Sequence, residues 1–442
     1  MKDGIVVYTG IYGFCKADFT EEFCGEFFME NNFCIPGAAR RIIDKIEENG
    51  FEAYFVGGCV RDKMLGREPN DYDIASDAEP EDIIDIFGDK STVKTGIKHG
   101  TVTVLDGKIP FEITTYRTES GYTDNRRPDK VSFVKDIKED LSRRDFTVNA
   151  AAYSPVRGLA DPFGAAEDIN ARLIRTVGEA EIRFREDALR IMRAVRFSAQ
   201  LGFSIESKTE RAVMDMYSLL DNISAERKSA ELMKTLAGKN AAEVLRKYDE
   251  LFMYLLPCLK KNKAGFYENI SKIEELHANT GTNNDTDEIT FAAALFMNTG
   301  ESFAEDISRM RFSNNVRAGI TELVRYSDKR SASDTAWVRR AVSETGEPQT
   351  RRLLKLRYSG GEYARMNNIF EDIKASGKCT SLKDMAVGGD DIVKLCGTEG
   401  KHIGAILRGL FDLMIDNDIE NDRAILLNIA EKMIKEGETH GD

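Results

Sequence analysis

The sequence has no long apolar run. Its longest apolar stretches, such as residues 292–297, are far shorter than the ~20 residues that a helix needs to cross a bilayer. The N-terminus lacks a basic region followed by an apolar stretch and a cleavage site, so we expect no secretory signal. The 7 cysteines are scattered without a C-x-x-C pair, which favours reduced thiols over disulfides or a zinc site. These absences predict a cytoplasmic protein without a membrane partner.

An overall positive charge is absent as well. The formal net charge is −13, with 62 basic and 75 acidic residues, which argues against a uniformly basic coat for nucleic acid. RNA binding stays open, because phosphate contacts depend on local groups of Lys and Arg. Such groups are present as two pairs, Arg126-Arg127 and Arg143-Arg144, and as five arginines between residues 183 and 196. A solvent-exposed helix face carries similar groups, so charge alone does not decide.

The chain is too long for one hydrophobic core, and its two parts differ in pattern. The first part has short apolar runs that predict strands, interleaved with helical patterns at residues 38–49 and from Pro80 onward. The predicted strands are residues 53–56, 72–75, 101–105, 111–115 and 131–134. After about residue 174 helical periodicity dominates, and polar loops are expected at residues 278–287, 327–334 and 376–380. The sequence therefore predicts an α+β head with a mixed sheet, followed by an all-α remainder.

Three carboxylates in the head are candidate metal ligands. Asp71 and Asp73 lead into an apolar strand, which would place both on one face. Glu112 lies between two large apolar residues of another predicted strand, where an unpaired charge would be costly. Carboxylates on adjacent strands are suitable ligands for a pair of Mg²⁺ ions that activate a hydroxyl and neutralise a triphosphate. The alternative for Glu112 alone is the solvent-facing side of an alternating strand.

A glycine pair precedes these aspartates. Gly57 and Gly58 follow the first predicted strand, and without side chains they let backbone N–H groups approach phosphate oxygens. Arg61, in the helix that follows, can pair with phosphate through its planar guanidinium. A glycine pair alone is also typical of a tight bend, so its meaning depends on the residues that complete the site.

These residues form motifs that resemble the class II tRNA nucleotidyltransferases. This family includes bacterial and eukaryotic CCA-adding enzymes and bacterial poly(A) polymerases, within the DNA polymerase β-like superfamily. The matching motifs are G-G-C-V-R-D (57–62) with N-D-Y-D-I-A (70–75), F-E-I-T-T-Y-R (111–117), R-R-D-F-T-V-N-A (143–150), D-P-F-G (161–164) and E-D-A-L-R-I-M-R-A-V-R-F (186–197). The resemblance implies a polymerase β-like head, a ribose-recognition motif containing Arg144, Asp145 and Asn149, and a nucleotide-selecting helix that begins near Glu186.

The last motif has a chemical interpretation of its own. Cytosine and adenine both present an exocyclic amine beside a ring-nitrogen acceptor, whereas uracil and guanine present a carbonyl oxygen. Asp187 would accept from the amine and Arg190, three residues on and on the same helix face, would donate to the ring nitrogen. Arg193 and Arg196 continue that face and would brace the pair or contact phosphate. Ion pairing within the helix, for example between Glu186 and Arg190, is the alternative.

Features outside the head narrow the choice of substrate. Residues 120–129 resemble the flexible loop of enzymes that add the terminal A, with Asn125 where glycine is commoner. Met297-Asn298 replaces the His-Asp pair of the metal-dependent phosphohydrolase domain of many relatives, so we expect no phosphohydrolase. Residues 381–404 resemble the C-terminal tail of CCA-adding enzymes, which favours tRNA as the partner. Arg339-Arg340 and Arg351-Arg352-Lys355 are candidate phosphate contacts, with exposed helix charge as the alternative for each.

The expected domains are a head at residues 31–165, a helical neck at 166–235, a body with a degenerate HD-like region at 236–345 and a tRNA-binding tail at 346–442. Residues 1–30 are either an N-terminal extension or the product of an early start codon, with Met29 as the true start. The resemblance implies template-independent addition of C, C and A to the 3′ end of tRNA from CTP and ATP, with Mg²⁺ as cofactor. A-addition alone, poly(A) synthesis and a catalytically inactive RNA-binding relative are the alternatives. The sequence does not determine the oligomeric state.

Overall fold

The computed structural model describes residues 33–121, 130–279, 287–329, 331, 333–396 and 401–438. Tertiary contacts divide these residues into two compact units. The first takes the described residues of Met1–Thr118, Val131–Arg144 and Val148–Ile169, and the second takes those of Glu119–Lys130, Asp145–Thr147 and Asn170–Asp442.

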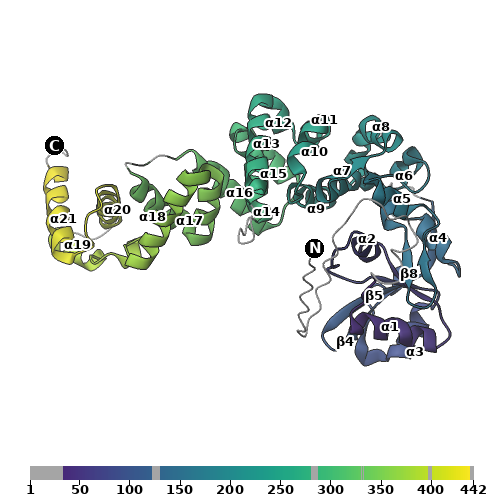
Figure 1. Cartoon of the computed structure of the whole chain (residues 1–442). Helices are drawn as coiled ribbons and strands as arrows, with labels where there is room; N and C mark the ends of the chain where they lie inside the picture. The colour runs from purple at the N-terminus through teal and green to yellow at the C-terminus, as the bar shows by residue number, and fades with distance from the viewer. Residues whose placement is uncertain are drawn as a thin grey trace, which may run out of the picture. The chain divides into compact units, whose positions relative to one another are not determined.

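A seven-stranded mixed sheet forms the centre of the first unit (Figure 1). Its order is β3-β4-β5-β2-β1-β8-β9, in which β2 and β5 are parallel and the other neighbours are antiparallel. The strands are β1 (Ala53–Val56), β2 (Ile74–Ser76), β3 (Thr92–Val93), β4 (Thr101–Asp106), β5 (Ile109–Thr115), β8 (Ala152–Ser154) and β9 (Gly158–Ala160). A separate two-stranded sheet contains β6 (Arg117–Ser120) and β7 (Lys130–Phe133). The predicted mixed sheet is confirmed.

Both faces of the sheet are covered. On one face, α1 (Gly37–Glu48) packs Ile43 and Ile46 into a core with residues of β1, β2, β4, β5 and α3 (Pro80–Phe87). The other face places Tyr54 and Val56 with Leu141 of α4 (Ile137–Ser142). Successive side chains of β1 point to opposite faces of the sheet. Since both faces are covered, all four residues of β1 are buried, and the strand is a continuous apolar run in the sequence. The first unit also contains α2 (Gly58–Met64), between β1 and β2.

The chain after the sheet is predominantly helical, as expected. Its helices are α5 (Ala165–Asn170), α6 (Ala180–Glu186), α7 (Leu189–Leu201), α8 (Ser207–Met216), α9 (Ala225–Leu236), α10 (Ala241–Lys247), α11 (Asp249–Leu255), α12 (Pro257–Lys261), α13 (Lys263–Ala278), α14 (Glu288–Phe296), α15 (Phe303–Arg309), α16 (Asn314–Ser327), α17 (Asp334–Arg357), α18 (Gly360–Ser376), α19 (Gly389–Cys396), α20 (Lys401–Asp416) and α21 (Arg423–Glu438). The expectation of an all-α remainder is wrong in one detail: β10 (Leu173–Ile174) and β11 (Ser204–Ile205) form a short parallel ladder. Two residues are too few for a strand pattern to be visible in the sequence.

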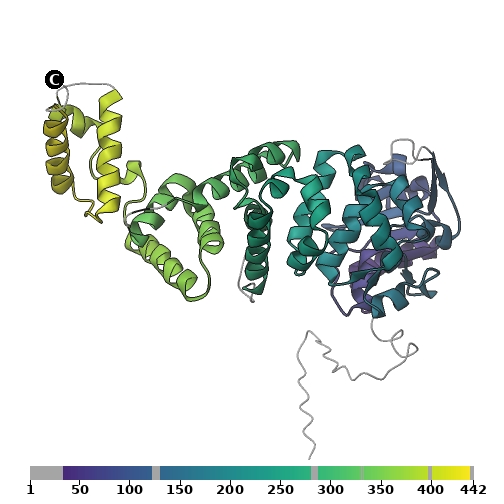
Figure 2. The same ribbon diagram turned by 90° about the horizontal axis from the view of Figure 1, so that it is seen from above.

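The C-terminal helices have a core of their own. Residues of α19, α20 and α21, including Ile392, Leu410 and Leu426, pack together, and α20 and α21 lie side by side at the yellow end of the chain in Figure 2. Helix α17 is bent at Gly346, whose φ of 81° is outside the helical range. Pro348 follows this bend, so the backbone changes direction within α17 for a local reason.

Several predicted features lie outside the described residues. These are residues 1–30, the part of the expected flexible loop that contains Asn125, and most of the polar loop at 278–287. At the two ends of the loop predicted at 327–334, α16 ends at Ser327 and α17 begins at Asp334, whereas residues 330 and 332 are also outside the described residues. None of the helices in the described part of the chain is both long and apolar enough to span a bilayer.

Candidate active site

The glycine turn lies between β1 and α2. Gly57 has a φ of +75°, which L side chains rarely adopt, and a Cβ added to it would lie 2.9 Å from Nη1 of Arg144. Gly58 is the first residue of α2. The turn therefore requires glycine at position 57 for its backbone conformation, and the guanidinium of Arg144 lies close to it.

Arg61 and Asn149 meet beside this turn. Nη1 of Arg61 donates to Oδ1 of Asn149 at 2.7 Å, and Nε and Nη2 of Arg61 donate to Asp62 at 2.9 and 2.8 Å. Arg61 and Asn149 are 88 positions apart in the sequence, so the fold brings together two side chains that belong to different motifs. The Asp62 and Asn149 contacts fix the plane of the guanidinium at the start of α2.

The three candidate metal ligands lie at neighbouring positions. Asp71 and Asp73 precede β2 rather than lying on it, because the strand begins at Ile74, two residues later than predicted. The carbonyl of Asp73 still accepts from Val56 N–H of β1 at 3.0 Å. Glu112 is on β5, and the residue after it, Ile113, pairs with Ile74 of β2. Asp73, directly before β2, and Glu112, on β5, therefore occupy neighbouring positions.

The electrostatic environment of Asp73 reflects this arrangement. Surrounding protein atoms remove water from one side of its carboxyl group, and together with the charges of Asp71 and Glu112 they raise its pKa to about 6. The guanidinium of Arg144 acts in the opposite direction. Three carboxylates and one arginine thus influence one another, which is the setting in which a bound cation would stabilise the ionised form of Asp73.

Oxygen ligands of this kind suit a hard divalent cation. Among the residues that the structure describes, however, no group of three or more His, Cys, Asp or Glu side chains is already arranged to hold an ion. The donor chemistry therefore fits a metal, whereas the side-chain positions do not form a complete coordination shell.

The second unit contains the other predicted site residues. Nε of Arg193 donates to Oδ2 of Asp145 at 2.7 Å, and Nε of Arg196 lies 2.6 Å from Oε2 of Glu231 on α9. Burial opposes the charge of Arg193, but Asp145 and Glu231 outweigh it and the pKa of Arg193 is raised. For Arg196 burial is the stronger effect, so its pKa is lowered despite Glu231. Both arginines are held in place by carboxylates.

Asp187 and Arg190 are not on one helix face, so that part of the prediction is wrong. Helix α6 ends at Glu186, Asp187 has extended backbone angles, and α7 begins at Leu189. The side chain of Asp187 accepts from Leu189 N–H at 3.1 Å, a local bond by which Asp favours helix ends over helix interiors. The sequence pattern alone does not show this break.

Each member of this pair has a protein partner. Arg227 of α9 donates to both carboxylate oxygens of Asp187, at 2.8 and 3.3 Å. Arg190 donates to Glu186 at 2.6 Å, the ion pair expected as the alternative to base recognition. Sequence reasoning missed Arg227 and Glu231. Both belong to E-R-K-S-A-E (226–231), whose charges four residues apart read as an ordinary exposed helix face.

Two of the five candidate phosphate contacts in the C-terminal half, Arg339 and Arg340, differ from both expectations. Arg339 is buried, and it donates to the carbonyl of Cys379 at 2.9 and 3.2 Å and to Asp418 at 3.2 Å. It is neither a surface phosphate contact nor an exposed helix charge. Arg340 is held at both ends of its guanidinium, by Asp412 at 2.7 Å and Asp416 at 2.8 Å. These two arginines join α17 to α20.

The second pair also forms ion pairs within the protein. Nη1 of Arg351 donates to Glu371 at 2.7 Å, and Nε of Arg352 donates to Asp287 at 2.7 Å. Lys355 also has an interaction with the rest of the protein. Phosphate binding by Arg351 or Arg352 would therefore compete with an existing carboxylate.

The end of α14 occupies the place of the expected degenerate HD-like motif. Met297 and Asn298 follow the last residue of α14, Phe296. The buried side chain of Asn269 donates to the carbonyl of Leu295 at 2.8 Å and accepts from Asn298 N–H at 3.2 Å. Asparagine side chains here bind backbone groups and hold α13 against α14.

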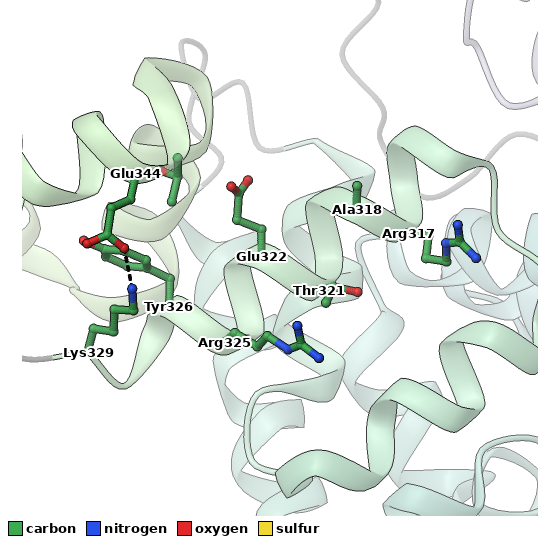
Figure 3. Close-up of a pocket in the computed structure, with 9 residues that line it drawn as sticks. Arg317, Ala318, Thr321, Glu322, Arg325, Tyr326, Lys329 and Glu344 are labelled. Carbon is green, nitrogen blue, oxygen red and sulfur yellow. Dashed lines mark hydrogen bonds and ion pairs between the residues drawn. The ribbon is translucent and has the colours of Figure 1, made fainter. Parts of the chain in front are cut away.

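A pocket of about 510 Å³ lies beside α16, near the bend of α17. Figure 3 shows Arg317 and Arg325 extending from α16, together with the ion pair between Lys329, which follows α16, and Glu344 of α17. Arg317 and Arg325 are both exposed, and Thr321 lies between them in the sequence. Arg325 forms no ion pair with a carboxylate among the described residues. Glu322 also lines this pocket, so the surface carries charges of both signs, with Arg317 and Arg325 as exposed cations that can contact an anion.

Comparisons with known proteins cover most of the chain. Three protein-family models match: "Poly A polymerase head domain" at residues 53–175, "Probable RNA and SrmB- binding site of polymerase A" at 202–262, and tRNA nucleotidyltransferase domain 2 at 282–430. The chain is 37% identical over 400 residues to a CCA-adding enzyme of Ligilactobacillus salivarius, which covers 89% of this chain and 96% of that protein. It is 36% identical over 402 residues to a CCA-adding enzyme of Enterococcus faecalis, covering 90% and 97%.

Solved structures give the same result for the fold. The CCA-adding enzyme of Bacillus stearothermophilus in complex with CTP matches with a TM-score of 0.73 and 30% identity, over 92% of this chain and 100% of that chain. A Thermotoga maritima CCA-adding enzyme complexed with tRNA matches with a TM-score of 0.60 over 89% and 94%. At 23% identity, the second match supports the fold alone.

Proposed function

This chain belongs to the family of CCA-adding enzymes, which are tRNA nucleotidyltransferases, and on that premise we propose that it adds C, C and A to the 3′ end of tRNA without a template. CTP and then ATP would supply the nucleotides. The 3′-hydroxyl of the tRNA attacks the α-phosphate, an O–P bond forms, and the bond to the β-phosphate breaks to release pyrophosphate. Each addition leaves a new 3′-hydroxyl for the next.

The observation that most directly supports this chemistry is the position of Asp73 beside Glu112, which the pairing of Ile74 with Ile113 produces. Membership of a nucleotidyltransferase family implies a divalent cation, and Mg²⁺ is the ion we propose. Asp71, Asp73 and Glu112 would hold a pair of these ions. When bound, one ion would activate the attacking hydroxyl and the other would offset the negative charge of the triphosphate and the leaving pyrophosphate.

The glycine turn would receive the triphosphate. Gly57 and Gly58 allow close approach of backbone N–H groups, and Arg61 can donate to phosphate oxygens. Asn149 holds Arg61 at this position through their 2.7 Å hydrogen bond. Asn149 and Asp145 are also the residues that we assign to the ribose, as the resemblance of their motif implies.

Base selection would use Asp187 and Arg190. A carboxylate oxygen has a further lone pair after accepting from Arg227, so it can also accept from the exocyclic amine of cytosine or adenine. Arg190 would donate to the ring nitrogen once its contact with Glu186 is exchanged or shared. Uracil and guanine lack this donor–acceptor pair and would be rejected. Arg193 and Arg196 would brace the site.

We further propose that residues 31–165 form the head, 166–235 the neck, 236–345 the body and 346–442 the tail, with the tail binding tRNA. The pocket beside α16 adds a candidate contact for the RNA backbone. Arg317 and Arg325 are exposed there, whereas the four arginines expected to contact phosphate are paired with carboxylates or carbonyl groups.

The test uses tRNAs that end before CCA, after C and after CC, each incubated with Mg²⁺ and one nucleotide at a time. Growth by C from the first two and by A from the third supports the proposal. Incorporation onto the CC end alone means an A-adding enzyme, and long A tracts on unrelated RNA mean a poly(A) polymerase, the activity for which the head-domain model is named.

An inactive RNA-binding relative would bind these tRNAs without extending them. Replacement of Asp71 by Ala tests the metal assignment, because it removes one of the proposed ligands without touching the glycine turn. Unchanged nucleotide incorporation by Asp71→Ala would contradict the assignment of the carboxylates to metal binding.

A further inference from the structure

Asp140, near the end of α4, is a buried carboxylate that binds two arginines. Its side chain is 1% exposed. Oδ1 accepts from Nε and Nη2 of Arg143, at 2.9 and 2.8 Å, and from the backbone N–H of Arg117 at 3.2 Å. Oδ2 accepts from Nη2 of Arg144 at 3.3 Å. A charge removed from water to this degree persists only with such partners.

Arg144 connects this buried carboxylate to the candidate active site. While its Nη2 is bound to Asp140, its Nη1 lies 2.9 Å from the position that a Cβ on Gly57 would occupy. One guanidinium thus binds the buried carboxylate and reaches the glycine turn.

We propose that Asp140 is a positioning residue for the triphosphate: it acts through Arg144, which it holds at the glycine turn. An arginine side chain loses considerable rotational freedom when it binds a ligand, and a partner that fixes it beforehand removes part of that cost. The guanidinium has five N–H donors, and its bond to Asp140 uses one N–H of Nη2. This inference rests on the proposed nucleotidyl transfer and adds a residue to its nucleotide site.

A purely structural role is the competing explanation, because Asp140 also binds Arg143 and the N–H of Arg117. The two explanations differ in what happens once Arg144 is removed. If Asp140 acts through Arg144, then Asp140→Asn should have no further effect on nucleotide binding in an Arg144→Ala background. If Asp140 serves only the fold, its effect should be the same in both backgrounds.

The experiment measures kcat and KM for CTP and for ATP with full-length wild type, Asp140→Asn, Arg144→Ala and the double variant. We expect Asp140→Asn to raise both KM values about tenfold with little change in kcat, as for an interaction made equally in the ground and transition states. In the Arg144→Ala background the further change should be less than about twofold. Glu139→Gln, an exposed neighbour on α4, is the matched control and should leave both parameters unchanged.

Thermal unfolding of each variant separates loss of binding from loss of structure. Should Asp140→Asn unfold at the assay temperature, Asp140→Glu carries the same test, because it keeps the charge but moves the carboxylate by one methylene. Unchanged KM values, or equal effects with and without Arg144, would overturn the proposal. Failure of the wild type to extend any tRNA would instead overturn the proposed function, so the two results are distinguishable.

Discussion

The bond between Arg227 and Asp187 leads to a prediction about nucleotide choice. Arg227 donates to both carboxylate oxygens of Asp187, and the two side chains are 27% and 18% exposed. This contact fixes the carboxylate that would accept from the amine of cytosine or adenine. Uracil has no amine at this position, so it gains nothing from a correctly oriented Asp187.

The size of the effect follows from the geometry. A hydrogen bond to a charged group contributes about 1.5–3 kcal/mol, and partial exposure places this pair at the lower end. Loss of about 1.4 kcal/mol corresponds to a tenfold change. We therefore expect Arg227→Ala to lower kcat/KM for CTP about tenfold and to leave that for UTP nearly unchanged, so that the ratio between them falls about tenfold.

A competition assay measures this ratio directly. A tRNA that lacks CCA is incubated with CTP and UTP together, and the incorporated nucleotides are counted. Arg211→Ala is the control, because Arg211 is exposed on α8 and forms no ion pair with another described residue. If Arg227→Ala keeps the wild-type ratio while Asp187→Ala abolishes it, then Arg227 does not orient the base-reading group.

Three further predictions concern the helical part. Asn269→Ala should lower the free energy of unfolding by about 2 kcal/mol, because it leaves the carbonyl of Leu295 and the N–H of Asn298 without this partner. Urea unfolding measures the change. The control Ser271→Ala should stay within about 0.5 kcal/mol of the wild type. Burial lowers the pKa of His277 in the folded protein below its ordinary value of 6.5. As the pH falls, the unfolded state therefore binds this proton before the folded state does. The free energy of unfolding should then fall as the pH drops below 6.5, by at most about 1.4 kcal/mol per pH unit. His277→Gln should reduce this slope in urea unfolding at pH 7.5 and 5.5. Arg325→Glu should weaken tRNA binding and reduce the slope of log K against log salt by about 1, whereas Lys260→Glu, an equal change of charge on α12, should leave that slope unchanged.

Local signals explain what the sequence predicts well. Strand β1 has the predicted bounds because four apolar residues end at a glycine, and α3 begins at Pro80 because proline suits the first turn of a helix. The proximity of Asp73 and Glu112 was also predictable. Asp73 precedes Ile74 of β2, and Glu112 precedes Ile113 of β5. Because Ile74 and Ile113 pair between parallel strands, Asp73 and Glu112 lie side by side.

Contacts between distant residues explain what the sequence does not show. Arg227 reaches Asp187 across 40 positions, and no periodic pattern links the two. At the break, the side chain of Asp187 accepts from Leu189 N–H, a local bond that competes with continuation of the helix. Arg339 is a second case in which a distant contact is not visible in the sequence. Adjacent arginines on a helix suggest exposed charge, but Arg339 donates to the carbonyl of Met414 on α20 and to Asp418.

The paired arginines also account for how an acidic chain can bind anionic substrates. The net charge of −13 would repel tRNA and nucleotides if it were evenly spread. Instead, predicted site arginines form ion pairs with acidic residues. These pairs are Arg144 with Asp140, Arg193 with Asp145 and Arg196 with Glu231. Each carboxylate weakens the local attraction, but it also fixes a planar donor group whose orientation would otherwise have to be found during binding. Because a carboxylate engages only part of the five N–H donors, the protein retains hydrogen-bonding capacity while reducing the entropic cost of recognition. Selectivity among phosphate-bearing ligands would then depend on the geometry of these pairs more than on net charge.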